Sequence, residues 1–167
     1  MKNEEKLYKL EREMIEWERG CPKRIQHFLK VHEFAVAIAK GEKVDEDTMF
    51  ILEALGYIHD IGIKIAEEKH GKYNGKTQEL YGEPAAREML VRLGFDKADI
   101  DRISMIVGKH HTYNADIEGL DFRILLEADA CVNMYEKDKS DDAKRAMLKN
   151  VFRTETGKQI YCTMFDL

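Results

Sequence analysis

The feature of this sequence that most restricts its fold is a set of acidic and imidazole side chains inside otherwise apolar helical faces. Asp129 lies in the middle of a stripe formed by Phe122, Leu125, Leu126 and Val132 at helical spacing. An ionised carboxylate buried there needs a cationic side chain, a proton or a metal ion. No basic residue shares the stripe. A cap on a neighbouring helix or a bond to a buried tyrosine would also satisfy Asp129 taken alone.

Histidines interrupt two further apolar helices. His27 and His32 both fall on the buried arc of a helix predicted at 22–40, and the helical wheel does not choose between them as functional residues. The pair His59-Asp60 directly follows the apolar run 49–58. A lone histidine on an apolar face is most often a hydrogen-bonded core residue, and this is our interpretation of His32.

One bound cation would satisfy these buried groups together. Asp60 and Asp129, with imidazoles such as those of His27 and His59, form a nitrogen and oxygen donor set typical of a transition-metal site. Water or substrate would fill the remaining positions, as a catalytic metal requires. The later helix leads through Ile103 and Val107 to two further histidines, His110 and His111.

Hydrophobic periodicity and capping residues predict an all-α helical bundle. The expected helices cover 4–18, 22–40, about 47–58, 84–93, 97–111 and 121–137, and another starts at Ser140-Asp141-Asp142. Residues 151–167 fit either a strand or a helix, and we favour a helix. Pro84 is expected to begin its helix, and His70 is expected at the surface of a glycine-rich loop over 70–76. The first helix is expected to dock on its own bundle.

Length and composition limit the classes of protein. The 167 residues fit one domain, 1–167, with the metal-site core at about 22–135. The net charge is −5 without a basic stripe, which argues against duplex nucleic acid as a partner. No apolar run reaches the length of a membrane span, and three scattered cysteines suggest reduced thiols, so we expect a cytoplasmic protein. It is expected to be a monomer or a homodimer.

Four segments in order resemble the HD-domain superfamily of metal-dependent phosphohydrolases, which is named for its His-Asp doublet. They are Arg24-Ile25-Gln26-His27 with the apolar positions after it, Ala54 to Gly62 around His59-Asp60, Ile103 to His111, and Glu127-Ala128-Asp129-Ala130. The resemblance spans roughly residues 22–135. It selects His27 over His32, and it implies a helical bundle with His27, His59, Asp60 and Asp129 as metal ligands.

The resemblance implies hydrolysis of a small phosphorylated compound, often a nucleotide, by attack of a metal-activated water. The catalytic residues would be Asp60, His110 and His111, and Lys64 and Lys109 could meet the phosphate. The cofactor would be a divalent transition metal, with Mn, Fe, Co, Ni and Zn not distinguished. His110 and His111 could instead shape the pocket or bind a second ion.

This chain departs from relatives that hold two metals. Those relatives place another histidine before a glycine in the segment that here reads Gln78-Glu79-Leu80-Tyr81-Gly82. One ion is therefore favoured, and Glu79 is interpreted as a solvated residue rather than a ligand. Some nucleotidase relatives carry a glutamate three residues after the doublet, where this chain has Ile63. The alternative functions are a regulatory HD module that binds metal or nucleotide without turnover and a di-iron oxygenase.

Overall fold

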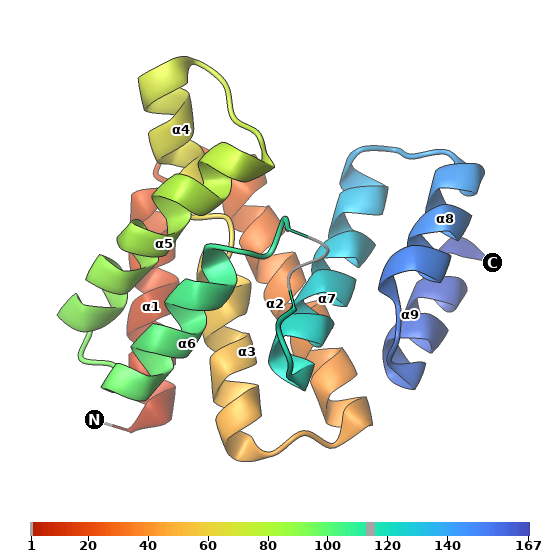
Figure 1. Cartoon of the computed structure of the whole chain (residues 1–167), viewed down its shortest axis with the longest axis horizontal. Helices are drawn as coiled ribbons and strands as arrows, with labels where there is room; N and C mark the ends of the chain where they lie inside the picture. The colour runs from red at the N-terminus through yellow and green to blue at the C-terminus, as the bar shows by residue number, and fades with distance from the viewer. Residues whose placement is uncertain (1, 113–115) are drawn as a thin grey trace.

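The computed structural model describes residues 2–112 and 116–167, which form nine α-helices and no strand (Figure 1). The helices are α1 (Asn3–Trp17), α2 (Pro22–Glu42), α3 (Glu46–Ile58), α4 (Gly62–His70), α5 (Gly75–Arg92), α6 (Lys97–Val107), α7 (Leu120–Glu136), α8 (Asp141–Val151) and α9 (Glu155–Phe165). The predicted all-α class is therefore confirmed. None of the helices in these ranges has the length and apolar character needed to cross a membrane.

Helices α2, α3 and α7 form the centre of the bundle. Each of the three packs against the other two, while α4, α5 and α6 lie on one side and α8 and α9 on the other (Figure 1). α3 is apolar around most of its surface, and eight of its thirteen residues are buried, which suits a helix that is covered on several sides. α1 packs against α3, as expected for a helix that docks on its own bundle.

Two glycines bring backbones close together beside the His-Asp pair. A Cβ atom on Gly56 would lie 2.6 Å from the Cα of His32, so α3 can approach α2 this closely only with glycine at position 56. A Cβ atom on Gly62 would lie 2.3 Å from the carbonyl oxygen of Gln78 and 2.6 Å from the backbone nitrogen of Gly82. The segment from Gly56 to Gly62 is thus held against α2 on one side and α5 on the other.

The fold differs from the sequence expectation mainly between residues 62 and 92. The polar stretch after Gly62 forms the helix α4, whose buried Ile63 and Ala66 face the protein. The prediction that Pro84 begins a helix is wrong, because α5 already starts after Asn74, whose side chain and that of Thr77 form a reciprocal capping box. Pro84 lies inside α5. Leu80, which is one helical turn before it, is exposed.

The end of the chain is helical and is attached to α7. The expectation of a helix within 151–167 is confirmed by α9. The buried Glu127 side chain accepts hydrogen bonds from the backbone nitrogens of Arg153, at 2.6 Å, and Thr154, at 3.0 Å, and from the Thr154 hydroxyl, at 2.5 Å. Glu127, which belongs to the Glu-Ala-Asp segment, therefore anchors the start of α9, while Asp129 faces another part of the structure.

Candidate metal centre

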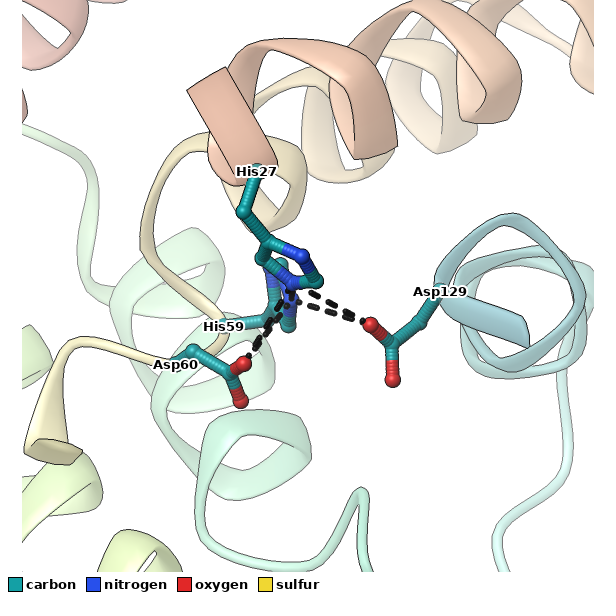
Figure 2. A group of neighbouring side chains, drawn as sticks. All are labelled: His27, His59, Asp60 and Asp129. Carbon is teal, nitrogen blue, oxygen red and sulfur yellow. Dashed lines mark hydrogen bonds and ion pairs between the residues drawn. The ribbon is translucent and has the colours of Figure 1, made fainter. Parts of the chain in front are cut away.

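Three helices bring four polar side chains together in the interior (Figure 2). His27 comes from the first half of α2, the His59-Asp60 pair from the turn directly after α3, and Asp129 from the middle of α7. All four are at most 8% exposed. The structure therefore brings together the residues that the sequence analysis selected, and it places Asp129 inside the protein rather than in solvent. His32 lies apart from this group, stacked on Tyr57.

The donor atoms of this group have the spacing that a bound ion requires. The Nε2 atom of His27 lies 3.4 Å from Asp60 Oδ2, 3.3 Å from Asp129 Oδ1 and 3.3 Å from His59 Nε2. The Nε2 atom of His59 lies 3.6 Å from Asp60 Oδ2 and 3.5 Å from Asp129 Oδ1. Donors at 2.0–2.2 Å from one ion in a tetrahedral arrangement are separated by roughly 3.3–3.6 Å. The group could therefore hold a metal ion.

Both imidazoles are oriented so that Nε2 points into the group. Nδ1 of His27 lies 3.1 Å from Glu136 Oε2, and Nδ1 of His59 lies 3.3 Å from the carbonyl oxygen of Leu55. Since a carboxylate and a carbonyl only accept hydrogen bonds, each Nδ1 is placed to donate its proton to them. The Nε2 atoms of the two rings both point into the group, where a bound metal ion would take the place of any proton on them.

The electrostatics of the group favour positive charge. Burial lowers the pKa of His27, but hydrogen bonds and charges from Asp129 and Asp60 outweigh it and raise the pKa to about 11. Burial raises the pKa of Asp60 and Asp129, but the surrounding histidines outweigh it and hold both below the ordinary carboxyl value. Ionised carboxylates in the protein interior are thus matched to a cation.

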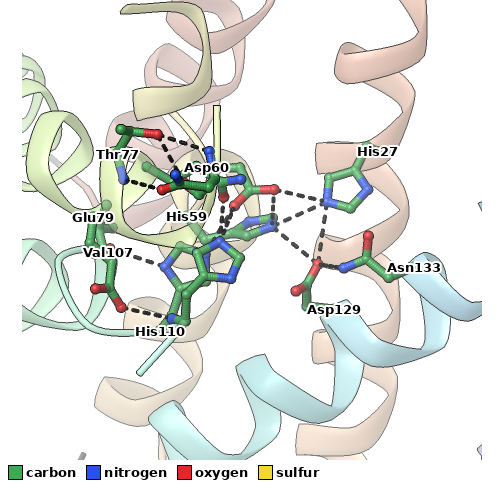
Figure 3. A network of polar contacts seen from close by, with 12 residues as sticks. His27, His59, Asp60, Thr77, Glu79, Val107, His110, Asp129 and Asn133 are labelled. Carbon is green, nitrogen blue, oxygen red and sulfur yellow. Dashed lines mark hydrogen bonds and ion pairs between the residues drawn. The ribbon is translucent and has the colours of Figure 1, made fainter. Parts of the chain in front are cut away.

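Asp60 also contacts a second pair of histidines (Figure 3). Its Oδ1 atom lies 2.9 Å from Nε2 of His110 and 3.3 Å from Nε2 of His111, while Oδ2 faces the first group. Nδ1 of His110 lies 3.0 Å from the carbonyl oxygen of Val107, and this contact fixes the ring with its Nε2 toward Asp60. Asp60, His110 and His111 form a second set of donors that could hold an ion.

Gln78 and Glu79 support this second set from α5. Nε2 of His111 contacts the side-chain oxygen of Gln78. The interpretation of Glu79 as a solvated residue is wrong, because its carboxylate accepts from the backbone nitrogen of His111, at 3.0 Å, and from the hydroxyl of Thr112, at 2.9 Å. Glu79 belongs to neither donor group and fixes the turn that carries His111.

Helix α7 holds the first group with two side chains that the sequence analysis did not select. Asn133 donates to Asp129 Oδ1 at 2.8 Å (Figure 3), and Glu136 accepts from His27 and lies 2.7 Å from the ammonium of Lys30. Asp129, Asn133 and Glu136 follow one face of α7 at spacings of four and three residues. This spacing from a buried aspartate is the signal that could have identified them.

A pocket of about 340 Å³ opens beside the candidate metal centre. It is lined by Cys21, Lys23, Arg24, His27, Asp60, Ile63, Glu67, Tyr73, Gln78, His111, Asn133, Glu136 and Lys137. His111 therefore faces the pocket, while the buried His110 is not among the lining residues. A volume of this size accommodates a small organic molecule next to the four donors.

The two lysines that were expected to meet phosphate lie elsewhere. The ammonium of Lys64 donates to the carbonyl oxygen of Trp17 at 2.5 Å and lies over the ring of that tryptophan. Lys109 is exposed and is not among the residues that line the pocket. His70 is exposed, as expected, and contacts Tyr81. Proximity to Asp60 or His110 in sequence did not place either lysine in the pocket.

The arrangement of these helices is also found in a solved structure. It is similar to the crystal structure of a predicted HD superfamily hydrolase from an uncultured Thermotogales bacterium, with a TM-score of 0.66 and 23% sequence identity. The match covers 96% of this chain and 83% of that chain. No family model matches the sequence, and no curated protein matches it.

Proposed function

We propose that this protein is a metal-dependent phosphohydrolase that acts on a small phosphorylated compound, with a nucleotide as the favoured substrate. The observation that carries the proposal is the convergence of His27, His59, Asp60 and Asp129 at ligand spacing beside an open pocket. The HD-type fold is consistent with this function. A group of this kind without a bound cation would leave two carboxylates and two imidazoles buried at a cost in stability.

In this proposal the four residues hold one divalent transition-metal ion. Such an ion supplies Lewis acidity, which polarises phosphoryl oxygens and acidifies water. Glu136 and Asn133 act as positioning residues, because they fix the ring of His27 and the carboxylate of Asp129.

Two histidines have different roles in this scheme. His111 faces the pocket, where its ring can donate a hydrogen bond to the leaving oxygen of the substrate. His110 is buried and orients Asp60 from the side opposite the first donor group. The exposed ring of Tyr73, which also lines the pocket, offers a surface on which a nucleobase can stack, and it is the observation that favours a nucleotide.

A second candidate rests on the second donor group. Asp60, His110 and His111 favour binding of a second ion, with Asp60 shared between the two sites. Two ions would fit either a two-metal hydrolase or a di-iron oxygenase. Two donors of this group are the adjacent histidines of the turn after α6, which ends at Val107 rather than at residue 111 as expected. The neighbouring α5 contributes Gln78 rather than a further histidine. One ion therefore remains the favoured number.

The test is metal analysis of the purified protein, followed by turnover of a panel of nucleotides and sugar phosphates. We expect about one transition-metal ion per chain and release of phosphate that the Asp60→Ala variant loses. Phosphate release that survives this substitution would contradict the proposed site. Bound metal without turnover would favour a regulatory module, and dioxygen-dependent oxidation with two irons per chain would favour the oxygenase.

A further inference from the structure

Most polar side chains that line the pocket are engaged with other side chains. The guanidinium of Arg24 lies 2.7 Å from Glu18 and 2.9 Å from Glu67, so its charge is shared between two carboxylates. Asn133 donates to Asp129. Gln78 and His111 contact each other, and Glu136 contacts His27 and Lys30. The charge of Arg24 is therefore already balanced by carboxylates, and the two amide side chains carry no charge with which to neutralise a bound anion.

The metal centre itself contributes little positive charge. Two carboxylates and two neutral imidazoles around one divalent ion sum to a net charge of about zero, if each aspartate counts as one negative charge. A phosphate monoester brings a charge of about −1.5 to −2 at neutral pH. Binding such a group in a partly enclosed pocket therefore requires further cations.

Two lysines of the pocket have the required freedom. Lys23 and Lys137 line it and are exposed, and within residues 2–112 and 116–167 neither has a hydrogen bond or an ion pair through its ammonium. Lys23 precedes His27 by four residues on α2, which places the two side chains on the same helical face. Lys137 directly follows Glu136, the partner of His27, at the end of α7.

The position of Lys23 is unfavourable for its own helix. It lies in the first turn of α2, which contains no acidic residue. The helix dipole disfavours cations at this end. Lys23 therefore gains little from local structure, whereas an anion in the pocket would be attracted to it.

We infer that Lys23 and Lys137 bind the phosphoryl group of the substrate from two sides, and that the site selects dianionic phosphate monoesters over monoanionic diesters. This inference rests on the proposed function, since it concerns the same pocket. It transfers the phosphate-binding role from Lys64 and Lys109 to two lysines that flank His27 and its partner Glu136.

The test measures binding of inorganic phosphate, which needs no turnover, by calorimetry at low ionic strength in the metal-loaded protein. A charge-assisted hydrogen bond contributes enough that its loss weakens binding by about tenfold. We expect Lys23→Met and Lys137→Met each to have this effect and the double variant to have a larger one. Lys149→Met, which removes an exposed charge on α8 outside the pocket, is the matched control.

The outcomes separate this inference from the proposed function. Phosphate affinity of the double variant within twofold of that of Lys149→Met would overturn the inference, as would the absence of phosphate binding by the unsubstituted protein. Loss of phosphate affinity in the lysine variants, without hydrolysis of any compound by the unsubstituted protein, would support the lysine assignment and contradict the enzyme. Where hydrolysis occurs, we expect the lysine variants to lose more activity toward a monoester than toward methyl p-nitrophenyl phosphate, a diester.

Discussion

Substitution of Gly56 by alanine would test whether close packing of α2 and α3 positions the metal centre. The added Cβ would lie 2.6 Å from the Cα and 2.8 Å from the Cβ of His32. Because the Cα obstacle is backbone, rotation of a side chain cannot relieve the contact. The two helices must therefore move apart, and they carry His27 and His59, whose Nε2 atoms are 3.3 Å apart.

The expected change in the free energy of unfolding follows from two opposing effects. Alanine in place of glycine inside a helix is favoured by about 1 kcal/mol. Overpacking costs about 1–3 kcal/mol, and a backbone obstacle favours the upper end of that range. The Gly56→Ala variant should therefore be destabilised by about 2 kcal/mol, which lowers the Tm by about 4–8 °C for a chain of this size. Metal affinity should also fall, by about tenfold or more, because the donors lose their spacing.

Urea unfolding of metal-free protein measures the stability, and calorimetric titration with Mn²⁺ or Zn²⁺ measures the affinity. The matched control is Gly108→Ala, because the added Cβ meets the side chain of the exposed Glu83, which can move away. A Gly56→Ala variant that is more stable than the unsubstituted protein, or that binds metal equally well, would refute the reasoning.

The other predictions concern the support of the site and its ion. Glu136→Ala should weaken metal binding about 10–100-fold in titrations, whereas Glu33→Ala, which removes the acid beside the non-ligand His32, should leave it unchanged. Removal of metal with a chelator should lower the unfolding free energy by about 2.7 kcal/mol relative to protein at a free metal concentration of 100 times Kd. In the Asp129→Asn variant, the unfolding free energies with and without metal should differ by much less than this amount. Glu127→Ala should destabilise the protein by about 2–4 kcal/mol and speed amide exchange in α9, since it leaves the donors at the start of α9 unpaired. Metal affinity should stay the same. Equal exchange rates in the variant and the unsubstituted protein would contradict this role of Glu127.

The residues of the candidate metal centre could be selected from the sequence because burial of charge is visible there. Asp129 and the His59-Asp60 pair interrupt apolar patterns, and an unpartnered charge in such a place requires compensation. The pattern does not give the distances between the donor atoms of these side chains. The choice of His27 over His32 came from resemblance, and in the structure His27 meets His59 and Asp129 whereas His32 stacks on Tyr57.

The supporting residues could not be found in the same way. Glu136 and Asn133 are only partly buried and resemble ordinary polar residues near the end of a helix. Lys64 and Lys109 illustrate the opposite error, because a position near a ligand in sequence does not fix the direction of a long side chain. Pro84 was interpreted as a helix start although the capping box at Asn74 and Thr77 begins α5 earlier.

Because Asp129, Asn133 and Glu136 share one face of α7, the site depends on the number of residues between them. One residue inserted between Asp129 and Asn133 would rotate everything after it by about 100°. Asp129 would keep its position while both positioning side chains turned away from their partners. A change in the length of this segment would therefore require new support for His27 and Asp129, whereas a substitution at an exposed position of α7 such as Tyr135 would leave that support in place.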